Sequence, residues 1–183
     1  MGWKARVCIA YTSVYGNTEK AAERLAEQLK ALGCPKIAMN NLALCDPAEA
    51  VEDAFRYGKL VLATTTYNAD VFPFMKEFIH HLTERNFQNR TIGLMENGTW
   101  APMAAKLMRA ELESMKNITL CENVVTIRSA ANAAAEAQMD ALAAELVAKY
   151  RDIKSVERKH SRTFYKSPGV FFTAKIKPPA KPT

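Results

Sequence analysis

The sequence predicts an α/β protein built on a doubly wound parallel sheet of five strands. Short, nearly all-apolar segments alternate with segments whose apolar residues recur at helical spacing, and turn residues separate them. The chain has 183 residues, of which 49% are hydrophobic, enough for one domain with a sizeable core. Ligands of such sheets bind beyond the carboxyl ends of the strands, where the strand order reverses. We therefore expect the loops after strands one, three and four to carry the site.

The first strand and helix are the most clearly marked elements. Val7–Tyr11 is almost wholly apolar, as a strand buried on both faces should be. The following helix is expected to begin with Asn17 or Thr18 as its N-cap, and Glu19 suits its positive end. Its inner face is formed by small and branched apolar residues at helical spacing, namely Ala22, Leu25, Ala26 and Leu29.

The later elements follow the same alternation. Further strands are expected over residues 36–42, 59–66, 90–95 and 124–128. Asn40 and Asn41 place the first of these towards a sheet edge. Asp46 is expected to cap a helix that has Pro47 at its first position. The remaining helices are expected over residues 73–84, 102–115 and 132–150.

A turn rich in hydroxyl groups joins the first strand to the first helix. It consists of Ser13, Val14, Tyr15, Gly16, Asn17 and Thr18, without a lysine or arginine. The first amides of a helix lack partners and favour an anion, and Gly16 lets the backbone approach a ligand. Neutral dipoles of this kind suit a monophosphate better than a nucleoside triphosphate, whose Gly-Lys-Ser or Gly-Lys-Thr loop is absent. An ordinary strand-to-helix turn is the alternative.

The loops after strands three and four each present one aromatic side chain. Tyr67 lies in the loop 64–70, and Trp100 ends the loop 96–100. Small and polar residues surround both, so their backbone groups can bond the edge of a planar ligand while the aromatic rings contact its faces. A flavin ring needs this arrangement. The alternative is that Tyr67 and Trp100 cover the top of the core.

These three segments resemble one family. In order and spacing, YTSVYGNTE (11–19), TYNADVFPFM (66–75) and ENGTWAPMAAKLM (96–108) are similar to the flavodoxin domain of the flavodiiron proteins, over about residues 5 to 150. The resemblance implies a flavodoxin-like sheet of order 2-1-3-4-5 and bound FMN. It places Ser13, Val14, Tyr15, Gly16, Asn17 and Thr18 around the phosphate. It places Thr66, Tyr67 and Asn68 on one side of the ring and Gly98, Thr99 and Trp100 on the other; Thr65, Glu96 and Asn97 complete the candidate set.

The sequence also departs from that family. Thr64, Thr65 and Thr66 stand where the family often has Ser-Pro-Thr. The metallo-β-lactamase-like di-iron domain that precedes this domain in the family is not in the sequence, and no cluster of His, Asp and Glu replaces it. We therefore do not expect this polypeptide to reduce oxygen or nitric oxide itself. It is either a separate flavodoxin-like carrier or a piece of a larger system.

Charge and cysteine patterns narrow the function further. The net charge of +6 comes from the segment after Asp152, which has eight basic residues and one acidic residue, whereas the rest has 17 basic and 18 acidic residues. The globular part is thus nearly neutral, which argues against nucleic-acid binding.

Four scattered cysteines predict neither disulfides nor a zinc site. Without a membrane span or a signal-peptide core, a soluble cytoplasmic protein is expected.

The basic segment is expected to be separate from the domain. We place a domain at residues 1–152 and a basic tail or arm, rich in aromatic residues and proline, at residues 153–183. One interpretation is an arm with a short strand over residues 169–176 that packs on this domain or on a second copy in a homodimer. Another is a docking segment for an acidic redox partner. A functionally silent extension is the third.

The leading functional hypothesis is an FMN-binding electron-transfer module in which no side chain acts as acid, base or nucleophile. Its expected partner is a redox protein, either rubredoxin-like, ferredoxin-like or a separate di-iron protein. The alternative is an FMN-dependent NAD(P)H oxidoreductase acting on quinones or similar acceptors, although the short loops do not favour it. A binding domain that has lost its cofactor is a third hypothesis. Whether the chain is itself an enzyme stays open.

Overall fold

A computed structural model describes residues 6–164, with side chains described as far as residue 148. Its main sheet has five parallel strands in the order β2-β1-β3-β5-β6. The strands are β1 (Val7–Tyr11), β2 (Ile37–Asn41), β3 (Lys59–Tyr67), β5 (Arg90–Asn97) and β6 (Ile118–Ile127). In order of appearance along the chain this is the predicted order 2-1-3-4-5, with β2 at an edge. The predicted fold class is confirmed.

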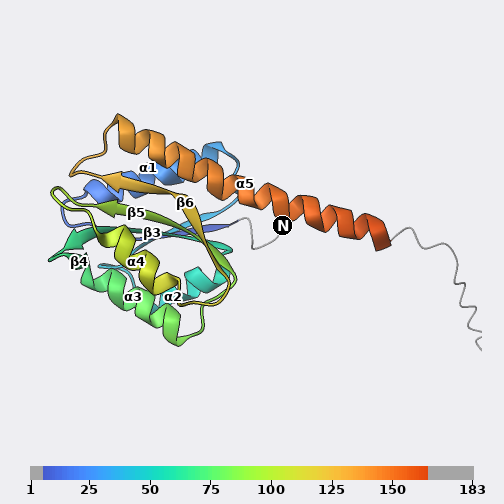
Figure 1. Ribbon diagram of the computed structural model, residues 1–183, viewed down its shortest axis with the longest axis horizontal. Coiled ribbons are helices and arrows are strands. Elements are labelled where there is room, and N and C mark those ends of the chain that lie inside the picture. Colours follow the sequence, from blue (N-terminus) through green and yellow to red (C-terminus); the bar gives the residue numbers. More distant parts are fainter. Residues whose placement is uncertain (1–5, 165–183) are drawn as a thin grey trace, which may run out of the picture. The chain divides into compact units, whose positions relative to one another are not determined.

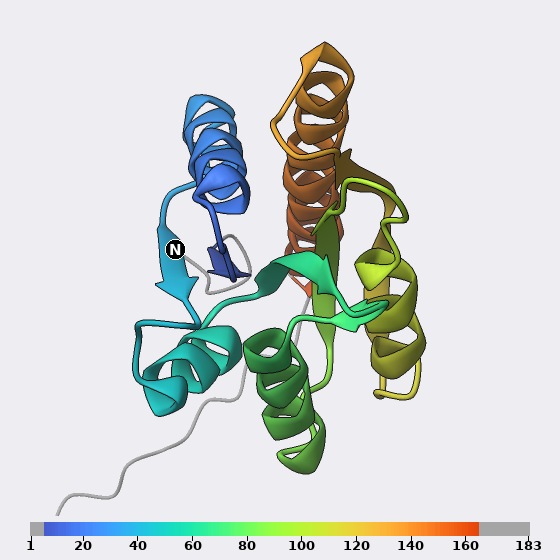
Figure 2. The ribbon, with the colours of Figure 1, turned by 90° about the vertical axis from the view of Figure 1, so that its left-hand side faces the viewer.

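Helices cover both faces of the sheet (Figures 1 and 2). One face carries α1 (Asn17–Ala31) and α5 (Ala133–Phe164), and the other carries α2 (Pro47–Arg56), α3 (Pro73–Glu84) and α4 (Ala104–Leu112). Each face has its own hydrophobic core. Ile9 and Val61 point into the core beneath α1 and α5, while Leu60 and Leu62 point into the other. This alternation follows from the two-residue period of a strand.

The start of α1 differs from the prediction. Neither Asn17 nor Thr18 is its N-cap: the N-cap is Gly16, with φ 80° and ψ −8°, which has no side chain to bond the first amides. The left-handed backbone at Gly16 turns the chain sharply from β1 into the helix, which glycine allows at little cost.

The cap of α2 is as predicted, because the Asp46 side chain accepts a hydrogen bond from the amide of Ala48 at 2.8 Å.

A tight hairpin that the sequence did not predict ends β3. The short strand β4 (Asp70–Val71) pairs antiparallel with the end of β3. Its two-residue turn places Asn68 at φ 49° and Ala69 at φ 58°. Both positive values are those of a type I′ turn, in which asparagine is common and alanine is strained.

Ala69→Gly is therefore expected to stabilise the protein. Glycine removes the strain at φ 58°, which outweighs its greater freedom in the unfolded chain, and the expected gain is about 0.5–1 kcal/mol. Urea unfolding followed by circular dichroism measures this. Ala48→Gly, in the right-handed first turn of α2, is the matched control and should destabilise the protein. A loss of stability in Ala69→Gly would contradict the assigned backbone strain.

Three elements differ from their predicted bounds by three residues or more at one end. β6 begins at Ile118 rather than Val124, because its register shifts between Leu120 and Val124. The carboxylate of Glu145 on α5 accepts hydrogen bonds from the amides of Glu122 and Asn123, which accommodates the irregularity. The helix predicted over residues 102–115 is limited to Ala104–Leu112, and α5 continues to Phe164 instead of ending at residue 150. No glycine or proline interrupts residues 133–164.

Four further expectations concern the chain as a whole. The cysteines are free, and burial raises the pKa of the Cys8 thiol to about 12. Within residues 6–164 we find no helix with the length and apolarity of a membrane span. The chain divides into two units, residues 1–151 and 152–183, and the site described next belongs to the first. The expected strand at residues 169–176, with its arm and docking roles, lies outside the described residues.

Candidate functional site

A pocket of about 730 Å³ lies beyond the carboxyl ends of β1, β3 and β5. The strand order reverses between β1 and β3, so the pocket lies at the switch point of the sheet. This edge of the sheet faces the viewer in Figure 2. The volume is in the range of small-molecule and cofactor sites. The pocket is lined by Ser13, Val14, Tyr15, Asn17, Thr18, Thr65, Thr66, Tyr67, Asn68, Ala69, Phe72, Pro73, Phe74, Asn97, Gly98, Thr99, Trp100, Ala101 and Ser129.

All the predicted site residues except Gly16 and Glu96 line this pocket. The lining residues that the prediction missed are Ala69, Phe72, Pro73, Phe74, Ala101 and Ser129. Most of them adjoin predicted residues in the same loops. Ser129 is different because it follows the fifth strand of the sheet, a loop from which no site residue was expected. The only sequence signal for this loop was its position at the same edge of the sheet, with polar residues in the turn 128–132.

The turn from β1 to α1 forms one end of the pocket. Gly16 has no side chain to cap α1, so within the described part of the chain the first amides of this helix are open to an acceptor from outside. The hydroxyl oxygen of Ser13, which lines the pocket, is buried and has no hydrogen-bond partner among the described residues. A buried hydroxyl without a partner is uncommon, because it loses its bonds to water without replacement. This end of the pocket therefore has several donors and no carboxylate among the described lining residues, which suits an anion.

Glu96 is directed away from the pocket. Its carboxylate accepts a hydrogen bond from the amide of Ala105 at 2.9 Å and another from the hydroxyl of Thr126 at 3.0 Å, and the residue is 7% exposed. Thr66 acts similarly, since its hydroxyl oxygen accepts from the amides of Met103 and Ala104 at 3.1 and 3.2 Å. Side chains from β3 and β5 thus cap α4 and fix the loop that carries Trp100.

Asn97 connects three of the loops around the pocket. Its Nδ2 donates to the hydroxyl oxygen of Thr18 at 3.3 Å and to the carbonyl of Ser129 at 3.1 Å. Its Oδ1 accepts from the amide of Ser129 at 3.2 Å. The hydroxyl oxygens of Thr18 and Thr65 are 3.4 Å apart. Polar groups from α1, β3, β5 and the loop after β6 therefore meet at the same end of the pocket as Ser13.

Aromatic side chains also line the pocket, from the turn after β1 and from the loops after β3 and β5. Tyr67 packs edge-on against Phe72 with a centroid distance of 5.6 Å, and Phe72 lies 5.9 Å from Phe74. Trp100 is 96% exposed and Tyr15 is 89% exposed. The alternative that Trp100 covers the core is therefore wrong. Exposed aromatic rings at the mouth of a pocket are available to contact a planar ligand.

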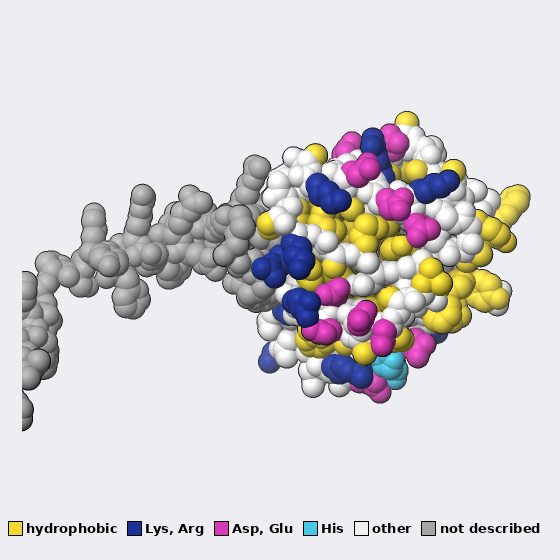
Figure 3. All heavy atoms as spheres, turned by 180° about the vertical axis from the view of Figure 1, so that it is seen from behind, with side chains coloured by type: hydrophobic (Ala, Val, Ile, Leu, Met, Phe, Trp, Pro, Cys, Tyr) yellow, Lys and Arg dark blue, Asp and Glu magenta, His cyan; other side chains and the backbone are white. Residues whose placement is uncertain are grey.

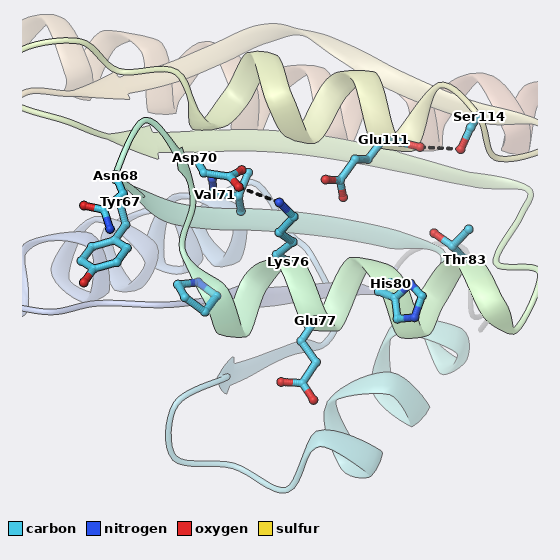
Figure 4. A pocket seen from close by; sticks show the side chains of 11 residues that line it. Tyr67, Asn68, Asp70, Val71, Lys76, Glu77, His80, Thr83, Glu111 and Ser114 are labelled. Carbon is cyan, nitrogen blue, oxygen red and sulfur yellow. Dashed lines mark hydrogen bonds and ion pairs between the residues drawn. The ribbon is translucent and has the colours of Figure 1, made fainter.

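None of the described residues that line the pocket carries a charge. Asp70 belongs instead to a neighbouring hollow of about 900 Å³ between α3 and α4 (Figure 4). There its carboxylate lies 2.6 Å from the ammonium of Lys76, and this bond together with the Val71 amide lowers the pKa of Asp70. Neither Glu96 nor Asp70 thus lines the pocket.

The sheet order and a neutral pocket at its switch point define a flavodoxin-like α/β protein. The comparison of sequences agrees: residues 8–115 match the family model described as the flavodoxin domain, and the chain belongs to that family.

One relative is the nitric oxide reductase of Moorella thermoacetica, 25% identical over 126 residues, which are 68% of this chain and 31% of that protein. This chain therefore spans about a third of the relative's length. Among solved structures, the rubredoxin oxygen:oxidoreductase of Desulfovibrio gigas superposes with a TM-score of 0.76 at 20% identity, over 81% of this chain and 36% of that one. The flavodiiron protein of Giardia intestinalis gives a TM-score of 0.70 at 17% identity, over 79% and 36%. The resemblance to the flavodoxin domain of flavodiiron proteins is confirmed.

Proposed function

We propose that this chain is an FMN-binding electron-transfer module. The observation that carries the proposal is the combination, in one uncharged pocket, of donors at the start of α1 with aromatic side chains from three loops. A flavin mononucleotide has the matching combination of a phosphate ester and a planar ring. Membership of the flavodoxin family supports a flavin as the ligand.

The residues present fit both parts of this cofactor. The amides at the start of α1 and the hydroxyls of Ser13 and Thr18 would hold the phosphate, because they supply donors and no carboxylate lines the pocket beside them. Tyr67 and Trp100 would contact the ring, and the backbone of the loops 65–69 and 97–101 would bond its polar edge. The volume of about 730 Å³ is sufficient for a ligand of this size.

Bound FMN would supply the redox chemistry, namely the uptake and release of one or two electrons. The protein would contribute position and electrostatics. Since no carboxylate lines the pocket, negative charge gained on reduction meets no repulsion from the described lining residues. The phosphate itself is held without a cation, which keeps the site neutral apart from the ligand. No lining side chain is needed as an acid or a base.

The surface around the pocket suits a protein partner. Hydrophobic side chains project from the end of the domain at which the strands terminate (Figure 3), and Val14, Tyr15, Phe74 and Trp100 there are each at least 45% exposed. Exposed apolar patches mark interaction sites, and encounters between redox proteins use small interfaces of this kind. We expect a rubredoxin-like, a ferredoxin-like or a separate di-iron partner.

Cofactor analysis and anaerobic reduction test this function. The protein is purified, its bound flavin is released and identified, and the loaded protein is then reduced with dithionite and mixed with oxidised rubredoxin. We expect FMN rather than FAD and rapid oxidation of the flavin by rubredoxin. Rapid reduction of the flavin by NADPH without any partner would favour the oxidoreductase instead. Absence of flavin, together with failure to take up added FMN, would contradict both functions.

Trp100→Ala is expected to weaken FMN binding by about 1–2 kcal/mol, as the loss of one aromatic ring from a stacked base does. Because Trp100 is 96% exposed, the free energy of unfolding without FMN should change by less than about 0.5 kcal/mol. Flavin fluorescence titration and urea unfolding measure the two quantities. Leu44→Ala is the matched control, since Leu44 is 84% exposed but does not line the pocket. Equal affinities in both variants would remove Trp100 from the site.

A further inference from the structure

Asn97 has every polar atom of its side chain engaged. One amide hydrogen is directed to the carbonyl of Ser129 and the other to the hydroxyl oxygen of Thr18, while Oδ1 accepts from the Ser129 amide. A carboxamide has two donors and one carbonyl oxygen, so all three are used. The residue is 7% exposed. Its orientation is therefore fixed by partners on two different segments.

The bond to Thr18 determines where the Thr18 hydroxyl can donate. Its oxygen accepts from Asn97, so its own hydrogen must be directed to another acceptor. Its other hydrogen-bond partner among the described residues is the hydroxyl of Thr65 at 3.4 Å, where either oxygen could be the donor, and this distance is longer than a good O–H···O bond of about 2.7 Å. An anion at the start of α1 is a better acceptor. The Thr18 proton is thus available to the ligand.

The pair of bonds to Ser129 holds a strained residue beside the same site. Ser129 has φ 69°, a left-handed conformation that serine seldom adopts. Both of its backbone polar groups bond the Asn97 side chain, which keeps the loop after β6 against the pocket. This explains why a loop from which the sequence predicted nothing contributes to the lining.

We infer that Asn97 is a positioning residue for the phosphate end of the site: it orients the Thr18 hydroxyl toward the phosphate and keeps the Ser129 loop in place. The inference rests on the proposed function, because it requires a phosphate ester in the pocket. It assigns to Asn97 an action through Thr18 instead of direct contact with the flavin ring. Its effect should therefore depend on the presence of the phosphate.

A comparison of FMN with riboflavin, which lacks the phosphate, tests this. Asn97→Ala should lower the affinity for FMN about tenfold, the equivalent of one lost hydrogen bond to a charged group, and leave the affinity for riboflavin unchanged. Thr18→Val, which keeps the volume of the side chain, should cause a similar loss for FMN alone. Replacing Asn97 in the Thr18→Val background should then lower FMN affinity little further, since the two residues act together.

Asn40→Ala is the matched control. Asn40 is also nearly buried, at 9% exposure, and its Nδ2 lies 3.4 Å from Cys8 Sγ and 3.3 Å from the Asp53 carboxylate, outside the pocket. It should leave the ratio of FMN to riboflavin affinity unchanged. A wild-type protein that binds FMN while Asn97→Ala or Thr18→Val keeps this ratio overturns the inference alone. A wild-type protein that binds no FMN overturns the proposed function and the inference with it.

Discussion

Ser13→Asp should nearly abolish FMN binding while the protein stays folded. The hydroxyl oxygen of Ser13 is buried at the donor-rich end of the pocket and has no partner among the described residues. A carboxylate there would occupy the position of the anion and repel the phosphate. At about 4 Å and an effective dielectric constant near 20, two unit charges repel by about 4 kcal/mol, which is on the order of a thousandfold in affinity.

The same substitution should change the stability of the ligand-free protein by less than about 1 kcal/mol. Ser13 lies in the turn just before α1, whose N-cap, Gly16, has no side chain to bond the first amides. A carboxylate near a helix N-terminus gains from the helix dipole, which offsets the cost of its partial burial. Urea unfolding without FMN measures the stability, and fluorescence titration measures the affinity.

Ser13→Asn separates charge from size in this experiment. Asparagine has nearly the same shape as aspartate but is neutral, so it should lose far less FMN affinity than Ser13→Asp. Riboflavin should bind Ser13→Asp about as well as wild type, because it has no phosphate to repel. Retention of FMN affinity by Ser13→Asp would place the phosphate elsewhere and contradict the site.

Glu96→Ala is expected to destabilise the protein by about 3 kcal/mol. The substitution leaves the amide of Ala105 and the hydroxyl of Thr126 without their acceptor inside the protein. It also removes a negative charge from the start of α4 and leaves a small cavity. Lost hydrogen bonds to a charged group account for about 1.5–3 kcal/mol, and the helix dipole and cavity add to this.

The loop that carries Trp100 lies between Glu96 and α4, so the same variant should also loosen it. Urea unfolding measures the stability, and the fluorescence anisotropy of the tryptophans reports the loop. Glu96→Gln is the matched control: its carbonyl oxygen can still accept from Ala105, so the expected loss is about 1 kcal/mol. A Glu96→Ala protein as stable as Glu96→Gln would show that the carboxylate does not cap α4.

The sequence predicted the parts of the fold that depend on local pattern. β1 is wholly buried and wholly apolar, so its bounds agree with the prediction. The start of β6 could not be predicted, because Glu122 and Asn123 interrupt its apolar pattern and their partner Glu145 lies on another element. The same holds for Glu96. Its position at the end of a strand was evident, but the α4 amides that it bonds are brought together only by folding.

The candidate site followed the same rule. Loops at the carboxyl ends of parallel strands meet at one edge, so the pattern predicted which loops share a pocket, and the resemblance to the flavodiiron proteins supplied most of the individual residues. Ser129 could not be predicted as a lining residue, because its position depends on the Asn97 side chain and on a backbone with φ 69°. The N-cap of α1 was also predicted wrongly. Asn17 and Thr18 are good capping residues by type, but the turn begins with Gly16 in a left-handed conformation.

Titration of the flavin-free protein with FMN and, in parallel, with riboflavin tests the central claim most directly. The claim is that uncharged donors at the start of α1 hold a phosphate ester. It predicts that one FMN binds per chain, with quenching of the flavin fluorescence, and that riboflavin binds much more weakly. Equal affinities for the two flavins, or no binding of either, would contradict the account.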